Sequence, residues 1–141
     1  MRRNTKGFTL MEMLIVVAIV AILVAIAIPA FSATLNKARV AADAANIRAG
    51  YAKAMAMVLD NTDYSKNTAY YLMQDGSIKE GGMPESNRYK TQGNASAEGV
   101  APIQIAGQTV KKWRKGQTLY YRVLVDASGS MTLDIVFPGT G

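Results

Sequence analysis

The residue with the clearest potential for chemistry in this chain is Glu12, because it stands at the head of an uninterrupted apolar series. Every residue from Met13 to Ile28 is apolar. A carboxylate inside a membrane-spanning helix costs about 2.5–3.5 kcal/mol at mid-bilayer and less near the interface, and by default it marks a functional site with a partner. We therefore expect Glu12 to have a positively charged partner.

The segment around Glu12 is long enough to cross a membrane. Residues 8–30 would extend about 34 Å as an α-helix, at a rise of about 1.5 Å per residue, and a hydrocarbon core is about 30 Å thick. Three cations, Arg2, Arg3 and Lys6, precede the segment. An excess of cations on this flank places the N-terminus in the cytoplasm and residues 31–141 outside.

Two simpler interpretations of the segment stay open. A secretory signal peptide has a shorter apolar region, of about 7–15 residues, that ends at a small-residue cleavage site. Ala25-Ile26-Ala27 could serve as that site. A plain signal anchor would account for the length and for the flanking charges, but it gives Glu12 no role.

The hexapeptide Gly7-Phe8-Thr9-Leu10-Met11-Glu12, with the apolar series behind it, resembles the N-terminal signal of type IV pilins and of the pseudopilins of type II secretion and DNA-uptake systems. The resemblance implies that a membrane prepilin peptidase cuts between Gly7 and Phe8 and that the new amine of Phe8 is N-methylated. Pro29 matches a proline common in the helix of these proteins. The match is strong over residues 6–29 and extends to about residue 59 only in general character.

The same resemblance implies a set of partners and a location. The subunit would polymerise with copies of itself and with minor pilins after processing by a prepilin peptidase/methyltransferase. An inner-membrane pilus assembly platform and its assembly ATPase would drive polymerisation. The chain would first be a single-pass protein of the cytoplasmic membrane, with its N-terminus in the cytoplasm, and later part of an extracellular or cell-envelope filament.

Cleavage would supply the partner that Glu12 needs. The new amine at Phe8 would lie four residues before Glu12, about one helical turn away. In a filament the amine and the carboxylate could compensate each other, most simply between neighbouring subunits whose helices pack with an axial offset. Burial of either charge alone would be costly, whereas a paired set is tolerated. We therefore predict assembly roles for Phe8 and Glu12.

Four segments follow from this arrangement. They are a leader of residues 1–7, a transmembrane and assembly half-helix of residues 8–30, an amphipathic half-helix of residues 31–59, and a head of residues 60–141. The chain of 141 residues has a net charge of +6. Three of these charges belong to the leader, which leaves +3 for the mature chain before its new amine is counted. The basicity therefore argues less for nucleic-acid binding than the charge of the whole chain suggests.

The apolar series continues into an amphipathic helix. A stripe on one face recurs at steps of three and four residues, and it comprises Val40, Ala44, Ile47, Tyr51, Ala54 and Val58. We expect one helix from Phe8 to near Leu59, with a bend near Pro29 because proline lacks the amide donor and crowds the preceding turn. The bend is either incidental or assists assembly by helping the helix to melt. Gly50 is a second weak point of the helix.

The rest of the chain is predicted to be mostly β-structure, which gives an α+β fold with an antiparallel sheet of three to four strands. Residues 69–73 are one strand candidate, and residues 79–99 are expected to form a long exposed loop. Four further candidates form two hairpins, and they are residues 100–105, 108–113, 118–125 and 131–137. We expect these hairpins to form one meander that covers the apolar stripe, since a sheet this small needs the helix for its core.

Few enzymatic mechanisms are open to this chain. It has no cysteine and no histidine, which removes thiol nucleophiles, Ser-His triads and the usual zinc sites. The acids of Asp60-Asn61-Thr62-Asp63 lack the spacing and the distal bidentate glutamate of a calcium loop. We therefore predict no catalytic residue, no cofactor and no metal site.

The run Lys111-Lys112-Trp113-Arg114-Lys115 is the one sharp basic feature of the head. Four cations around an indole could bind a phosphate backbone while the ring stacks on a base of DNA. The alternative is a solvated edge strand whose lysines discourage edge pairing, with Trp113 partly buried.

The sequence thus predicts a pilin, a structural filament subunit rather than an enzyme. One alternative is a pseudopilin of a secretion or competence machine, which shares the N-terminal chemistry. Another is a membrane-anchored binding module that never polymerises.

Overall fold

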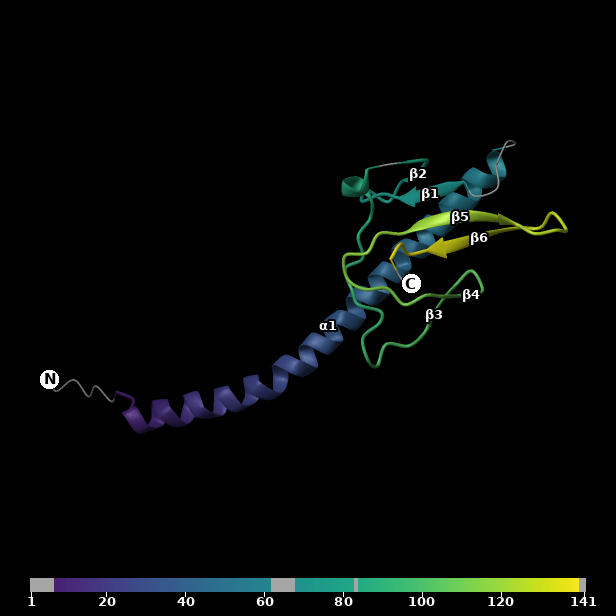
Figure 1. Ribbon diagram of the computed structural model, residues 1–141. Coiled ribbons are helices and arrows are strands. Elements are labelled where there is room, and N and C mark those ends of the chain that lie inside the picture. The colour runs from purple at the N-terminus through teal and green to yellow at the C-terminus, as the bar shows by residue number, and fades with distance from the viewer. Residues whose placement is uncertain (1–6, 62–67, 83, 140–141) are drawn as a thin grey trace. The chain divides into compact units, whose positions relative to one another are not determined.

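The computed structural model describes residues 7–61, 68–82 and 84–139 (Figure 1). The chain divides into two compact units, Met1–Leu35 and Asn36–Gly141, which are treated separately below. One helix, α1 (Leu10–Asp60), runs through the boundary between them. The single long helix that the sequence predicts is therefore confirmed.

The first unit consists, in its described part, of the short approach to α1 and the apolar portion of that helix. The backbone stays helical through Pro29. The bend expected near this proline stays a prediction. The large apolar side chains of this unit are all exposed, and Phe8 keeps 81% of its accessible surface. The unit therefore has no core of its own among the described residues.

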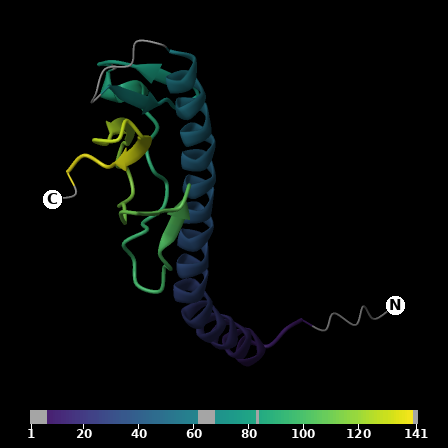
Figure 2. The same cartoon turned by 90° about the vertical axis from the view of Figure 1, so that its right-hand side faces the viewer.

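The second unit packs strands against the C-terminal half of α1. In Figure 2 the teal, green and yellow strands lie along one side of the blue part of the helix. The buried helix positions in this unit are Val40, Asp43, Ala44, Ile47, Gly50, Ala54 and Val58. Five members of the predicted stripe are therefore buried, while Tyr51 is only partly buried. Two members of the buried face, Asp43 and Gly50, lie outside the predicted stripe.

The main sheet is antiparallel and has four strands in the order β2-β1-β5-β6. These strands are β1 (Ala69–Leu72), β2 (Ile78–Glu80), β5 (Tyr120–Val125) and β6 (Met131–Val136). A second sheet contains only the hairpin of β3 (Ile103–Ile105) and β4 (Gln108–Val110). The predicted α+β fold is thus confirmed, with a sheet of four antiparallel strands.

The predicted meander of two joined hairpins is wrong. Strand β1 pairs with β5, with Tyr70 opposite Tyr121, and thereby occupies the edge of β5 that a meander would have offered to β4. The other edge of β5 is taken by β6 along the whole strand. The hairpin β3-β4 therefore forms a separate two-stranded sheet.

The predicted exposed loop of residues 79–99 is also partly wrong. Its first two residues belong to β2, and Glu85–Asn87 forms a short 3-10 helix, η1. Thr91 and Ala95 are buried. The approach to α1 is close at Gly93, where a Cβ atom would lie 2.5 Å from the backbone nitrogen of Val40. The part around residues 91–95 is therefore packed on the helix, while most of residues 79–90 are exposed as predicted.

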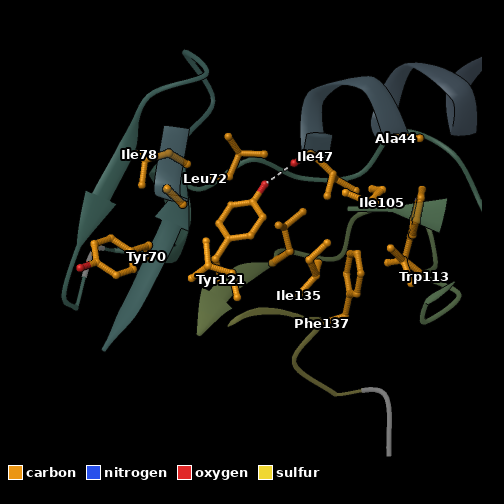
Figure 3. Packing of buried hydrophobic residues seen from close by; sticks show 14 of the residues in the cluster. Ala44, Ile47, Tyr70, Leu72, Ile78, Ile105, Trp113, Tyr121, Ile135 and Phe137 are labelled. Atoms are coloured by element: carbon orange, nitrogen blue, oxygen red, sulfur yellow. Dashed lines mark hydrogen bonds between the residues drawn. The ribbon is translucent and has the colours of Figure 1, made fainter. Parts of the chain in front are cut away.

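The core of the second unit joins helix, sheet and hairpin (Figure 3). The hydroxyl of Tyr121 donates a hydrogen bond of 2.8 Å to the carbonyl oxygen of Ile47 in α1. The rings of Trp113 and Phe137 stack with centroids 5.4 Å apart. Aromatic side chains from outside the helix thus fill the space along its buried face.

Candidate functional site

The N-terminus of α1 is closed by a reciprocal pair of hydrogen bonds between Thr9 and Glu12. The Thr9 backbone N–H donates to Oε2 of Glu12 at 3.0 Å, and the Glu12 backbone N–H donates to Oγ1 of Thr9 at 3.2 Å. The carbonyl of Thr9 accepts the first helical bond, from the backbone N–H of Met13 at 3.2 Å. This arrangement is a capping box, which satisfies backbone donors that a helix start leaves unpaired.

The capping box corrects the predicted start of the helix. With Thr9 as the N-cap, α1 begins at Leu10 and not at Phe8. Phe8 and Gly7 both precede the helix and are exposed. Both residues that flank the Gly7–Phe8 peptide bond are thus accessible. Cleavage and methylation at this bond stay predictions.

Glu12 retains capacity for a second partner. Its hydrogen bond to Thr9 uses one carboxylate oxygen, and an ionised carboxylate offers about four acceptor positions in all. The side chain lies on an exposed part of the helix. Glu12 can therefore close its own helix and still accept a cation from another chain.

The segment behind Glu12 meets the requirements of a membrane span. Within the described residues, α1 is the one helix long and apolar enough to cross a bilayer, and its best 18-residue window has a mean hydropathy of 3.2. None of that window is buried inside the chain. Pro29 is exposed as well. The whole apolar surface is thus open to lipid or to other chains.

The environment of the basic run, residues 111–115, differs from the two that the sequence suggested, namely a DNA-binding surface with an accessible indole and a solvated edge strand. Lys111, Lys112, Arg114 and Lys115 are exposed, but they follow β4 and do not form an edge strand. Trp113 is wholly buried, with 0% of its surface accessible. A ring enclosed in this way cannot stack on a base while the head is folded, so that part of the DNA hypothesis is wrong. Contact of DNA with the four cations stays a prediction.

The indole of Trp113 leads to a buried carboxylate that the sequence analysis missed. Its Nε1 donates to Oδ2 of Asp43 at 3.2 Å, and Asp43 has no accessible surface. The backbone N–H groups of Gln92 and Gly93 donate to the same carboxylate at 2.9 and 2.8 Å. The Tyr89 hydroxyl donates to Oδ1 at 2.6 Å. Four residues from two segments of the head are thus tied to one helix position.

The surroundings of Asp43 also change the acidity of Tyr89. Burial, reinforced by the hydrogen bond to the Asp43 carboxylate, raises the pKa of Tyr89 to about 12. Burial likewise raises the pKa of Tyr121. Within the described residues no group of three acidic side chains is placed to hold a metal ion. The Asp43 cluster therefore anchors the head to the helix, and we assign it no reaction.

The position of Asp43 could have been found in the sequence. It lies three residues after Val40 and four before Ile47, which is the spacing of the apolar stripe itself. An acid in such a stripe must be hydrogen-bonded when it is buried. The capping box has a sequence signature too, namely Thr followed by Glu three residues later before an apolar run.

Comparison with known proteins finds similarity both in the N-terminal segment and over most of the chain. Residues 2–28 match the prokaryotic N-terminal methylation motif. The chain is 33% identical over 120 residues to a fimbrial protein of Neisseria meningitidis, an alignment that covers 81% of this chain and 63% of that protein. No solved structure matches the chain significantly.

Two proteins of Thermus thermophilus are similar over shorter stretches. The type IV wide pilus major component PilA4 is 40% identical over 67 residues, which cover 48% of this chain and 51% of that protein. The type IV narrow pilus major component PilA5 is 52% identical over 52 residues, which cover 35% and 45%. The chain thus spans about half to two thirds of the length of these curated relatives.

Proposed function

We propose that this chain, which belongs to the type IV pilin family, is a structural subunit of a type IV pilus-like filament. The observation that carries the proposal is the first half of α1, where the large apolar side chains are exposed and where residues 2–28 match the methylation motif. Exposed apolar surface on this scale marks a membrane or protein interface. This apolar surface would contact lipid before assembly and the helices of neighbouring subunits after assembly.

The mature subunit begins at Phe8 in this proposal. A prepilin peptidase removes residues 1–7, and the same processing methylates the new amine. The chain waits as a single-pass protein of the cytoplasmic membrane, with its N-terminus in the cytoplasm, until the assembly platform and its ATPase extract it. It then polymerises with copies of itself and with minor pilins at the cell surface.

Glu12 has two tasks in this scheme. Within its own chain it caps α1 through Thr9. Towards a neighbouring subunit it offers a carboxylate to the amine of Phe8, because burying the amine and the carboxylate as a pair avoids the cost of burying either alone. The pair fixes the axial position at which one helix packs against the next.

Intact mass of the protein extracted from membranes tests the processing step. We expect a chain that starts at Phe8 and carries one additional methyl group. A Gly7→Ala variant leaves the rest of the segment unchanged and serves to probe the demand for glycine before the cut. A membrane protein that still starts at Met1 in cells with surface filaments would contradict the proposal.

The two tasks of Glu12 can be separated by one substitution. Glutamine also closes a capping box but carries no charge, so Glu12→Gln keeps the helix cap and removes the partner of the amine. We expect Glu12→Gln to insert into the membrane normally and to yield less than a tenth of the wild-type filament, measured by shearing and immunoblotting. Wild-type filament yield from Glu12→Gln would leave Glu12 with the capping role alone.

Imaging separates the two alternatives. A pseudopilin would show the same mass and the same dependence on Glu12 but would build only a short filament within the envelope. An anchored binding module would be indifferent to Glu12→Gln. The relatives are named as fimbrial and pilus components, which favours the surface filament.

A further inference from the structure

A groove with two cations lies between α1 and the segment that leads into the β3-β4 hairpin. It has a volume of about 510 Å³. From the helix it is lined by Lys37, Val40, Ala44 and Arg48, and from the other side by residues 99–104. Arg48 crosses the groove, since its Nη2 donates to the carbonyl oxygen of Gln104 at 3.0 Å. We call this feature the basic groove, and its described lining contains no carboxylate.

The opposite end of the head has the complementary character. Leu59, in the last turn of α1, keeps 69% of its surface exposed. Asp60 and Glu80 line a hollow beside it, together with Met57 and Tyr70. This end, called the acidic tip, presents apolar side chains with two carboxylates. In Figure 2 the green hairpin and the end of α1 lie at opposite ends of the sheet-bearing half of the helix.

We infer that the basic groove of one subunit binds the acidic tip of a second copy of this chain. Apolar side chains of the tip would cover the apolar floor of the groove, while Asp60 and Glu80 face Lys37 and Arg48. Two grooves or two tips brought together would repel each other, so the contact joins unlike surfaces. Such a head-to-tail contact generates an open helical polymer when its rotation does not close a ring. The inference rests on the proposed filament function and adds a head interface to it.

The positions of the two surfaces also set a spacing. Leu59 lies 15 residues beyond Ala44 and 19 beyond Val40 on the same helix, which corresponds to about 22–29 Å along its axis. Subunits of a polymer of this kind share one polarity. Two subunits in contact through the groove and the tip are therefore offset by about 22–29 Å along the filament.

The absence of cysteine from the chain allows a direct test of proximity. A full-length Leu59→Cys/Ala101→Cys variant places one thiol on the tip and one on the rim of the groove. On oxidation of assembled filaments we expect a ladder of covalent dimers and higher oligomers. The two single-cysteine variants are the controls and should stay monomeric. Filaments of the double variant that yield no ladder would overturn the inference.

Charge reversal tests the complementarity. Lys37→Glu/Arg48→Glu changes the groove, and Asp60→Lys/Glu80→Lys changes the tip. We expect each variant alone to lose at least fivefold in sheared filament while its membrane pool is retained. Cells that express both variants should recover at least half of the wild-type yield, because each altered groove then meets an altered tip and each native groove a native tip.

A matched control reverses two exposed cations elsewhere on the head, Lys90→Glu/Lys115→Glu, and should assemble as the wild type does. Wild-type yield from either reversed variant alone, or no recovery when both are expressed, would overturn the head interface. These outcomes leave the filament function intact, whereas a native chain that forms no filament refutes that function instead.

Discussion

Two carboxylates on the same helix, Glu12 and Asp43, are used in opposite ways. Glu12 lies on an exposed segment and accepts a hydrogen bond from the backbone of Thr9, three positions away. Asp43 is wholly buried and accepts hydrogen bonds from residues 46 to 70 positions away. The carboxylate oxygens of Asp43 accept hydrogen bonds from other parts of its own chain. The carboxylate of Glu12 still has acceptor positions to spare, so another subunit could bind there.

The apolar side chains of the two halves differ in the same sense. Ile19 is 53% exposed and Ile47 is 0% exposed, although both lie in α1. Full burial of such a side chain stabilises by about 1.5–3 kcal/mol. In the first half this free energy is not obtained within the chain, so it is available for contacts with lipid or with other chains. In the second half it holds the head on the helix.

The largest expected effect is the difference in the stability of the head between two substitutions, Asp43→Ala and Glu12→Ala. Asp43→Ala leaves two buried donors, on Gly93 and Trp113, and two partly buried donors without their acceptor, and we expect the free energy of unfolding of the head to fall by about 3–5 kcal/mol. Glu12→Ala should leave that free energy unchanged, because it affects only the cap of the first half. Denaturant unfolding of the full chain in detergent, followed by the fluorescence of Trp113, measures both. Equal effects of the two substitutions would remove the distinction between the halves.

Local patterns account for the parts of the fold that the sequence predicted. The end of α1 near Asp60 and the apolar stripe follow from a helical period, and strands β5 and β6 follow from alternation. The pairing of β1 with β5 does not, because 47 residues separate Leu72 from Tyr120 and no local signal chooses between two possible edges. Strand neighbours are decided by the packing of the whole head.

The candidate site shows the same limit. The motif Gly7-Phe8 and the acid Glu12 could be selected from the sequence because their spacing is local. The burial of Trp113 could not, because the residue lies in a run of four cations and its partners, Asp43 and Phe137, are distant in the chain. The four charged neighbours suggested that Trp113 would be at least partly exposed. The neighbours are exposed, but the indole is buried in the core.

A second prediction concerns Gly50, where helix propensity and core packing have opposite effects on the stability of a Gly50→Ala variant. Replacement of glycine by alanine in a helix interior stabilises by about 1 kcal/mol. In this structure a Cβ atom at Gly50 would collide with the hydroxyl of Tyr121 and approach Leu72 to 3.0 Å. Overpacking of this kind costs about 1–3 kcal/mol, so we expect Gly50→Ala to lower the stability of the head by roughly that amount in a thermal or denaturant melt.

The control for Gly50 is the same substitution in a Tyr121→Phe background. Tyr121→Phe alone removes the hydrogen bond to Ile47 and should cost about 1 kcal/mol. With the hydroxyl gone, Gly50→Ala should cost less than it does in the wild type, which gives a coupling energy in a double-mutant cycle. A cycle without coupling would mean that Gly50 does not make room for Tyr121.

The smallest expected effect is a pH dependence confined to the second half. The pKa of Tyr89 is raised from 10.0 to about 12 in the folded head, so its contribution to stability is fully present below pH 10 and is lost as the pH rises towards 12. Tyr89 is partly exposed, and after solvent screening we expect no more than about 1 kcal/mol from this titration. Tyr89→Phe should make the decline in stability between pH 10 and 12 shallower. Part of the decline should persist, because the pKa of Tyr121 is raised as well. An unchanged slope in urea melts across this interval would show that Tyr89 does not report on the Asp43 cluster.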